Sequence, residues 1–201
     1  MDQKVALLLM AAGQSKRMNQ AKQLVMINEV PLICKMMSQL KSEQLVSYVV
    51  TGSYRNEVVS LIDDPEWKEI YNPEWKRGMG HSIATGVSEI SDPDLVSGIL
   101  IVAVDQVRLK ASHLESILDI HLRHPRCIIV SFYGKSSGIP VLFPSDLIPE
   151  LNELDGDNGA KSVMRKHLDR VIYYHLPEGI TDLDSPQDLQ EYIKSLSHEN
   201  N

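Results

Sequence analysis

Short, nearly continuous apolar runs recur along the chain and alternate with stretches in which apolar and polar residues mix. Runs that are apolar throughout, rather than at every second position, are typical of strands buried on both faces, as in a parallel sheet. The pattern predicts four such strands, at residues 5–10, 46–51, 98–104 and 127–132.

The intervening stretches place apolar residues on one face of a helix, with a proline or a capping serine ahead of each. They predict helices over residues 32–40, 54–62, 114–121 and 189–196. Strands alternating with helices indicate an α/β fold with a mostly parallel central sheet and right-handed crossovers. The length of 201 residues suits a single domain over 1–201. Segment 133–161 is richer in Gly, Ser, Pro and Asp, and we expect it to be an insertion over the sheet that binds substrate.

The loop after the first predicted strand combines one glycine, Gly13, with the cations Lys16, Arg17 and Lys22. Ligands of such sheets bind at the carboxyl ends of strands, where this loop lies. It matches neither G-x-G-x-x-G nor G-x-x-x-x-G-K-[ST], which disfavours a nicotinamide-dependent oxidoreductase and a P-loop. Backbone N–H groups with flanking cations can hold a triphosphate. A turn with solvated cations is the equally open alternative.

Three aspartates follow apolar or turn segments in a way that suits a metal ion. Asp105 ends the third predicted strand, where a carboxylate is a natural Mg²⁺ ligand or, equally, the start of a turn. Asp182 and Asp184 precede Pro186, and for this pair helix capping is the stronger reading. The sequence therefore indicates a metal site only if these segments meet in space.

Two glycine-containing segments are candidates for ligand contact. In 77–82, closely spaced glycines allow a backbone to approach a ligand, Ser82 can cap a helix or bind a base or ribose, and we expect His81 in an exposed turn. Residues 134–143 and 155–161 suit either turns or a pocket for a second, polar substrate.

Composition limits the location and the partners. A net charge of −7 argues against nucleic acid. Cys34 and Cys127 stand in apolar sequence without a CxxC pair, which indicates reduced thiols, and no histidine has zinc-site spacing. The N-terminal apolar run is too short for a membrane span and lacks a basic leader. We expect a cytoplasmic protein that binds no membrane.

Six short blocks, in order along nearly the whole chain, resemble the molybdenum cofactor cytidylyltransferases, a branch of the nucleotidyltransferases related to the enzyme of molybdopterin guanine dinucleotide synthesis. Several positions depart from the family pattern: Asn19 replaces a glycine and Val107 a proline, and residues 135–137 and Ile139 stand where the family is expected to carry Arg or His. The resemblance implies a Rossmann-like three-layer nucleotidyltransferase fold. The blocks are residues 10–22, 78–83, 105–107, 138–143, 156–160 and 182–188.

The resemblance also implies roles for individual residues, with Arg17, Lys22 and Asp105 as the catalytic ones. Arg17 and Lys22 would hold the triphosphate, and Asp105 would bind Mg²⁺ with Asp182 and Asp184 completing the metal site. The nucleotide would contact Ala11, Ala12, Gly13, Gly80 and Ser82, and the pterin would contact Gly138, Pro140, Asp157 and Gly159.

The implied reaction is attack by the terminal phosphate of molybdopterin on the α-phosphorus of CTP, with release of pyrophosphate. The product would serve a molybdenum hydroxylase of the xanthine dehydrogenase type. The Ala-Ala-Gly mouth of the loop resembles the cytidine-using branch, and the methyl of Ala12 narrows the space beside a base. GTP as donor, a sugar- or alcohol-phosphate as acceptor, and a non-catalytic protein that delivers the cofactor are the alternatives.

Overall fold

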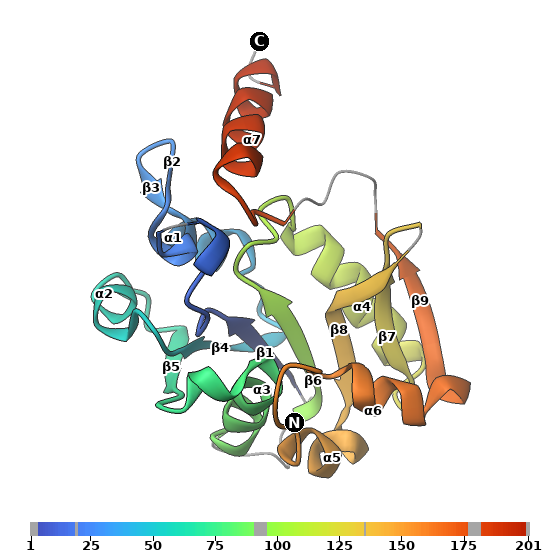
Figure 1. Ribbon diagram of the computed structural model, residues 1–201. Helices are drawn as coiled ribbons and strands as arrows, with labels where there is room; N and C mark the ends of the chain where they lie inside the picture. Colours follow the sequence, from blue (N-terminus) through green and yellow to red (C-terminus); the bar gives the residue numbers. More distant parts are fainter. Residues whose placement is uncertain (1–3, 19, 91–95, 135, 177–181, 200–201) are drawn as a thin grey trace.

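A seven-stranded sheet forms the centre of the computed structural model (Figure 1), which describes residues 4–18, 20–90, 96–134, 136–176 and 182–199. Its strand order is β5-β4-β1-β6-β8-β7-β9; β8 is antiparallel to both neighbours, and the other pairs are parallel. The strands are β1 (Lys4–Met10), β4 (Leu45–Thr51), β5 (Trp67–Tyr71), β6 (Val96–Ala103), β7 (Ile128–Phe132), β8 (Ser137–Pro144) and β9 (Val171–His175). A small hairpin, β2 (Met26–Ile27) with β3 (Val30–Pro31), stands apart from this sheet.

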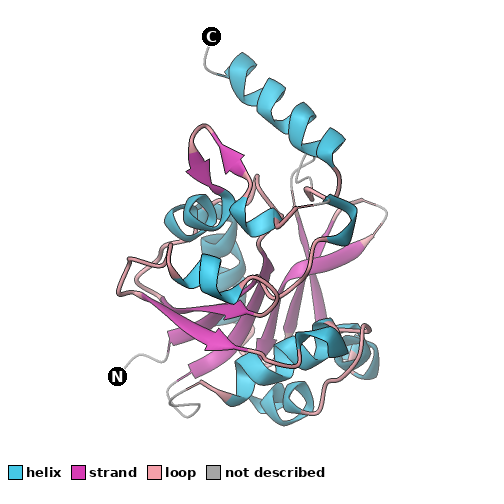
Figure 2. Cartoon of the chain, turned by 60° about the vertical axis from the view of Figure 1, so that its left-hand side comes forward, coloured by secondary structure: helices cyan, strands magenta, loops and turns pink. Residues whose placement is uncertain are grey.

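Helices cover both faces of the sheet, so the molecule has three layers (Figure 2). They are α1 (Leu32–Gln39), α2 (Arg55–Val59), α3 (Met79–Ser88), α4 (Ala111–Arg123), α5 (Ile148–Asn152) and α6 (Lys161–Lys166). The last helix, α7 (Pro186–Glu199), projects from the molecule beyond the carboxyl end of β6 (Figure 1). Successive residues of a strand point to opposite faces. Accordingly Leu7 and Leu9 pack with α1, α2, α4 and α7, whereas Leu8 and Met10 pack with α3, α5 and α6. The expected three-layer α/β fold is confirmed.

The four predicted strands and the four predicted helices are all present, with α2 ending at Val59 rather than near residue 62. The structure adds strands β2, β3, β5, β8 and β9 and helices α3, α5 and α6, which lie outside the predicted ranges. The expectation that segment 133–161 lies over the sheet is wrong for its first part, because β8 runs through the sheet between β6 and β7. This strand was not predicted because it contains Pro140. A proline has no N–H to donate within a sheet, and the pairing of β7 with β8 shifts its register at this residue.

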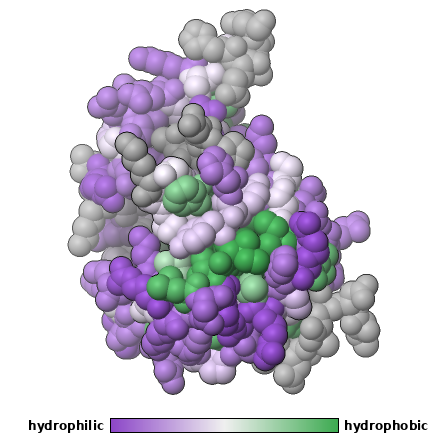
Figure 3. Space-filling view, turned by 90° about the vertical axis from the view of Figure 1, so that its right-hand side faces the viewer, coloured by the Kyte–Doolittle hydropathy of each residue, from purple (hydrophilic) through white to green (hydrophobic). Residues whose placement is uncertain are grey.

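The edge strand β9 bounds the face shown in Figure 3, where hydrophobic side chains gather in a band. Leu168, in the short 3-10 turn before β9, and Tyr173, on the strand, are 59% and 54% exposed.

In the part of the chain that the structure describes, no helix is long and apolar enough to cross a membrane.

A chain crossing at the carboxyl end of the sheet determines where the acidic residues lie. Gln106, just after β6, forms an isolated antiparallel bridge with Asp182. The N–H of Leu183 donates to the carbonyl oxygen of Asp105 at 3.1 Å. The segment ahead of α7 is therefore tied to the turn after β6, although about 80 residues separate them in the sequence.

Candidate functional site

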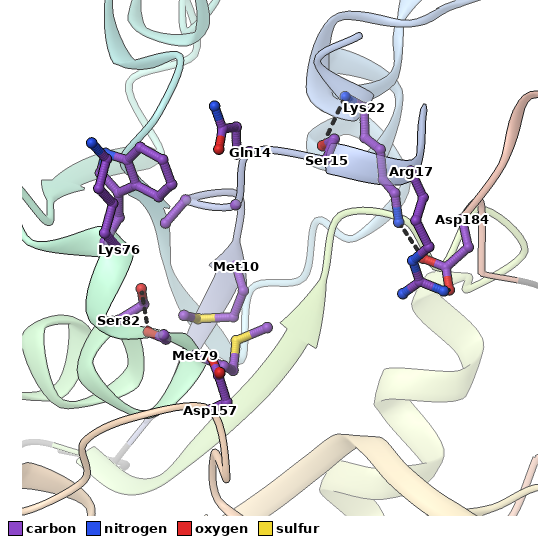
Figure 4. A pocket seen from close by; sticks show the side chains of 14 residues that line it. Met10, Gln14, Ser15, Arg17, Lys22, Lys76, Met79, Ser82, Asp157 and Asp184 are labelled. Atoms are coloured by element: carbon purple, nitrogen blue, oxygen red, sulfur yellow. Dashed lines mark hydrogen bonds and ion pairs between the residues drawn. The ribbon is translucent and has the colours of Figure 1, made fainter. Parts of the chain in front are cut away.

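A cavity of about 580 Å³ opens at the carboxyl end of β1 (Figure 4). Its wall combines the loop after β1, the segment that leads into α3, and single residues from two later loops. The lining residues are Met10, Ala12, Gly13, Gln14, Ser15, Arg17, Lys22, Trp75, Lys76, Gly78, Met79, Ser82, Asp157 and Asp184. The cavity thus collects residues from four of the six sequence blocks, those at 10–22, 78–83, 156–160 and 182–188. Asn19 lies outside the described residues.

A buried glutamine that sequence reasoning missed holds the loop after β1 in shape. The Gln23 side-chain amide donates to the carbonyl oxygens of Ala11 at 2.6 Å and Gly13 at 2.9 Å, and Gln23 is 1% exposed. In a trans peptide the following N–H points away from the carbonyl, so those of Ala12 and Gln14 face away from Gln23. The only sequence signal was a polar residue directly after Lys22, in a short 3-10 turn (Lys22–Leu24).

Of the three nucleotide contacts predicted at the mouth of this loop, Ala12 and Gly13 line the cavity and Ala11 does not. Ala12 lines the cavity and packs closely on Gly52, where an added Cβ would lie 2.6 Å from the Ala12 carbonyl oxygen and 2.7 Å from the Cβ of Trp75. Ala11 is buried outside the wall, and its N–H donates to Val50 at 2.9 Å. Ala12 and the Trp75 indole therefore form one side of the cavity.

Cations and acids that the sequence presented far apart meet at the other side of the cavity. The Lys22 ammonium contacts Asp105 Oδ2 at 2.8 Å and Asp184 Oδ1 at 2.6 Å, and Arg17 contacts Asp184 Oδ2 at 2.9 Å. The side chain of Lys22 is 11% exposed, whereas that of Arg17 is 76% exposed. Burial acts against the charge on Lys22, but Asp105 and Asp184 outweigh it and raise its pKa.

Asp182, the third predicted acid, lies next to this cluster because it forms the isolated bridge with Gln106. Partial burial, and then the charges of Asp105 and Asp184, raise the pKa of Asp182 to about 6. Among the residues that the structure describes, no three His, Cys, Asp or Glu side chains converge closely enough to hold a metal ion by themselves. The space between Asp105 and Asp184 holds the Lys22 ammonium instead.

The glycines ahead of α3 allow a close approach of two backbones. Gly78 has φ +109°, and an added Cβ would lie 2.5 Å from Asp157 Oδ1. The Gly80 N–H donates to the Gly156 carbonyl at 2.8 Å, and a Cβ there would lie 2.7 Å from the Asp155 carbonyl oxygen. Gly80 is absent from the cavity wall, so its visible role is to admit the 155–157 loop.

Ser82 does line the cavity, and the structure fixes its hydroxyl with two partners. It accepts a hydrogen bond from the buried Asn72 amide at 3.0 Å and donates to the Gly78 carbonyl at 3.2 Å. The expectation that His81 lies in an exposed turn is wrong: it is part of α3, its side chain is 18% exposed, and it lies 3.3 Å from Glu74 Oε2. Sequence reasoning missed it because the two glycines before it, Gly78 and Gly80, suggested a turn.

A second cavity of about 320 Å³ adjoins the first and shares Met79 and Asp157 with it. Of the residues predicted for the pterin, Gly138, Asp157 and Gly159 line this second cavity. Pro140 is buried beside it and does not line it; its carbonyl oxygen accepts a hydrogen bond from Ser131 Oγ at 2.6 Å. Two neighbouring cavities with a common wall are the arrangement that a two-substrate transfer requires.

The family model of the MobA-like NTP transferase domain matches residues 7–171. This chain belongs to that family. It is a nucleotidyltransferase, as the sequence blocks predicted. It is 23% identical over 199 residues to the purine catabolism protein PucB of Bacillus subtilis (strain 168), covering 94% of this chain and 95% of PucB.

Solved structures share the fold at lower sequence identity. The manganese complex of Rv0371C from Mycobacterium tuberculosis H37Rv has a TM-score of 0.79 and 18% identity over 96% of this chain and 100% of its own. The molybdopterin-guanine dinucleotide biosynthesis protein A of Archaeoglobus fulgidus has a TM-score of 0.71 and 13% identity over 96% and 100%. At these identities the solved structures show that the fold is shared, and it is the family match that agrees with the resemblance to the molybdenum cofactor nucleotidyltransferases.

Proposed function

We propose that the protein transfers CMP from CTP to the terminal phosphate of a molybdopterin-type cofactor and releases pyrophosphate. The observation that carries the proposal is the cluster of Arg17, Lys22, Asp105 and Asp184 at the border of a cavity that adjoins a second one. One cavity would hold the nucleotide and the other the acceptor, so that the two reacting groups meet near the cluster.

The residues of the cluster would supply binding and charge rather than covalent chemistry. Arg17 is largely exposed and can turn its guanidinium onto two phosphate oxygens. Lys22 can exchange its carboxylate partners for the triphosphate, because its ammonium already lies at the cavity wall. Negative charge that builds up on the α-phosphorus and on leaving pyrophosphate would be stabilised by both cations.

The donor set fits a Mg²⁺ ion that arrives with the nucleotide. Mg²⁺ in phosphoryl-transfer sites is typically held by one or two carboxylates, with phosphates and waters completing its shell. Asp105 would supply one carboxylate, and Asp182 or Asp184 the second; when bound, the ion would neutralise phosphate charge. The manganese complex of Rv0371C supports a divalent metal in this family.

Cytidine as the base is supported by the tight wall around Ala12. Its methyl group lies against Gly52, and the packing there is so close that the Ala12 side chain cannot move back to widen the cavity. A pyrimidine needs less room beside this wall than a purine. Guanylyl transfer from GTP is the second candidate, because the resemblance extends to the guanine dinucleotide branch.

The recipient of the product and the location follow from the same proposal. PucB is named for purine catabolism, which favours a molybdoenzyme of the xanthine dehydrogenase type as the final recipient. Both cysteines are free thiols, in keeping with the reducing cytoplasm. A protein that only delivers the cofactor would bind it without consuming CTP.

Pyrophosphate release distinguishes these functions. The purified protein is mixed with Mg²⁺, one of CTP, GTP, ATP or UTP, and either molybdopterin, a sugar phosphate or an alcohol phosphate. We expect release with CTP and molybdopterin, and a loss of more than 100-fold in Asp105→Asn but none in Asp119→Asn, an exposed aspartate on α4. Release with GTP or with a sugar phosphate instead would replace the proposed substrate. Binding of molybdopterin without any release would favour delivery.

A further inference from the structure

Among the described residues that line the first cavity, Trp75 is the aromatic one. Its side chain is half-buried: part of it packs against the core cluster on the α3 face of the sheet, and the rest borders the cavity. An aromatic ring that the protein supports and that a cavity reaches offers a surface on which a flat ligand can stack. No step of the proposed function has used this ring.

Contacts on both sides hold the backbone and the Cβ of Trp75 in place. The buried Asn72 accepts a hydrogen bond from the Glu74 N–H at 2.9 Å, and the Trp75 carbonyl accepts one from the Gly78 N–H at 3.1 Å. Gly52 leaves room for the side chain, because an added Cβ there would lie 2.7 Å from the Trp75 Cβ. Trp75 is therefore positioned before a ligand arrives, which lowers the cost of binding.

The Trp75 side of the cavity lies opposite the cations that would hold the triphosphate. Figure 4 shows Lys76, the next residue in the chain, on one side of the cavity and Arg17 and Lys22 on the other. A nucleotide whose phosphates contact Arg17 and Lys22 would extend its base away from them, across the cavity. That direction leads to the wall formed by Ala12 and Trp75.

We propose, on the basis of the function proposed above, that the indole of Trp75 stacks on the base of the nucleotide. Stacking requires only a flat ring, so Trp75 would strengthen the binding of any base, and the choice among bases would stay with the wall at Ala12. Lys76 offers a different contact: its ammonium lies 5.6 Å from the centroid of the indole, and a cation there can attract phosphate instead. The experiment must therefore separate the ring from the charge beside it.

The chain contains two tryptophans, so fluorescence can report on the contact directly. Trp67 lies on β5, is 4% exposed and packs in the core cluster on the opposite face of the sheet. Trp67→Phe therefore leaves Trp75 as the single tryptophan, and Trp75→Phe leaves Trp67. We expect CTP with Mg²⁺ to quench the fluorescence of Trp67→Phe and to leave that of Trp75→Phe unchanged.

Calorimetry then measures how much the ring contributes. Trp75→Leu should weaken CTP binding about 5- to 150-fold, the range for the loss of base–aromatic stacking, and should leave the binding of inorganic triphosphate unchanged. Trp75→Phe keeps a ring and should recover most of the CTP affinity. Lys76→Met, the matched control for the charge, should weaken CTP binding less than Trp75→Leu does. Thermal unfolding checks that each variant is folded, and if Trp75→Leu is not, the quenching comparison decides.

The inference is overturned if CTP binds without quenching Trp67→Phe, if Trp75→Leu binds CTP as tightly as wild type, or if it loses CTP and inorganic triphosphate equally. Binding of CTP to the wild-type protein separates the two proposals, because its presence with any of those results contradicts only the inference. If another nucleotide binds in place of CTP, the same comparison is made with it, and the proposed donor is wrong. Binding of no nucleotide contradicts both proposals.

Discussion

Lys22 connects the loop after β1 to two aspartates from distant segments. Replacing it therefore tests whether this cluster contributes to the free energy of unfolding of the protein without nucleotide. Lys22→Met keeps the length of the side chain and removes the charge. Losing one partner costs about 3–5 kcal/mol in a fully buried pair and about 0–1 kcal/mol in an exposed one. Because the side chains of Lys22, Asp105 and Asp184 are 11%, 21% and 39% exposed, the cost lies between these limits.

We therefore expect Lys22→Met to lower the free energy of unfolding by about 2 kcal/mol at pH 7, which corresponds to a fall in Tm of about 4–8 °C for a protein of this size. The pH dependence follows from the raised pKa of Lys22. A raised pKa means a stabilisation that is fully present below the ordinary lysine value and lost only above the higher folded one. The difference between wild type and variant should thus stay constant from pH 7 to pH 9.

Urea unfolding of both proteins at pH 7, 8 and 9 measures this difference. Lys41→Met is the matched control, since Lys41 also contacts two acids but is 47% exposed, and it should change stability much less. Equal losses in the two variants would refute the reasoning, because burial would then be irrelevant. A difference that shrank between pH 7 and pH 9 would refute it as well.

Three further predictions address other parts of the site. Asp182→Asn should stabilise the protein at pH 8 but not at pH 4, because the pKa of about 6 marks a charged form that folding penalises. The rise of the pKa from the ordinary aspartate value to about 6 corresponds to at most about 3 kcal/mol, and because Asp182 is only partly buried, solvent screening reduces the expected gain to about 1 kcal/mol in urea unfolding. An equal gain at both pH values would contradict this. Gln23→Leu should weaken CTP binding at least tenfold by calorimetry, because two loop carbonyls lose their donor; an unchanged Kd would show that the loop holds its shape alone. Gly80→Ala should cost about 2 kcal/mol, because its Cβ would meet the 155–156 backbone, whereas Gly13→Ala, with open space around its Cβ, should unfold at the wild-type Tm; equal Tm values for both would rule out the close contact.

The sequence indicated individual residues of the candidate site but not the contacts between them. Arg17, Lys22 and Asp105 were recognisable from residue type and position after an apolar run, whereas Asp184 was singled out only by the family resemblance, because its position before Pro186 favoured helix capping. What the sequence did not indicate is that Lys22 pairs with both acids, or that Gln23 shapes the loop. Both depend on contacts between segments far apart in the chain, or on the path of a short turn that has no periodic pattern.

Hydrophobic patterning by itself determined the class of fold. Continuous apolar runs such as residues 5–10 are typical of strands buried on both faces of a sheet, and the amphipathic stretches between them need that sheet to cover their apolar sides. These are local properties, since each run carries its own burial requirement. That is why β1, β4, β6 and β7, with four helices, were predictable.

Tertiary structure alone decided the place of β8, the separation of the two cavities and the pairing of the acids with Lys22. Strand β8 contains Pro140 and lies among glycines, so its local sequence resembles a loop; β6 and β7 make it a strand by pairing with it on both sides. The 155–157 loop divides the cavities because Gly78 and Gly80 admit its backbone. Pairing and close approach depend on the partner as much as on the residue, and the partner is fixed only once the chain has folded.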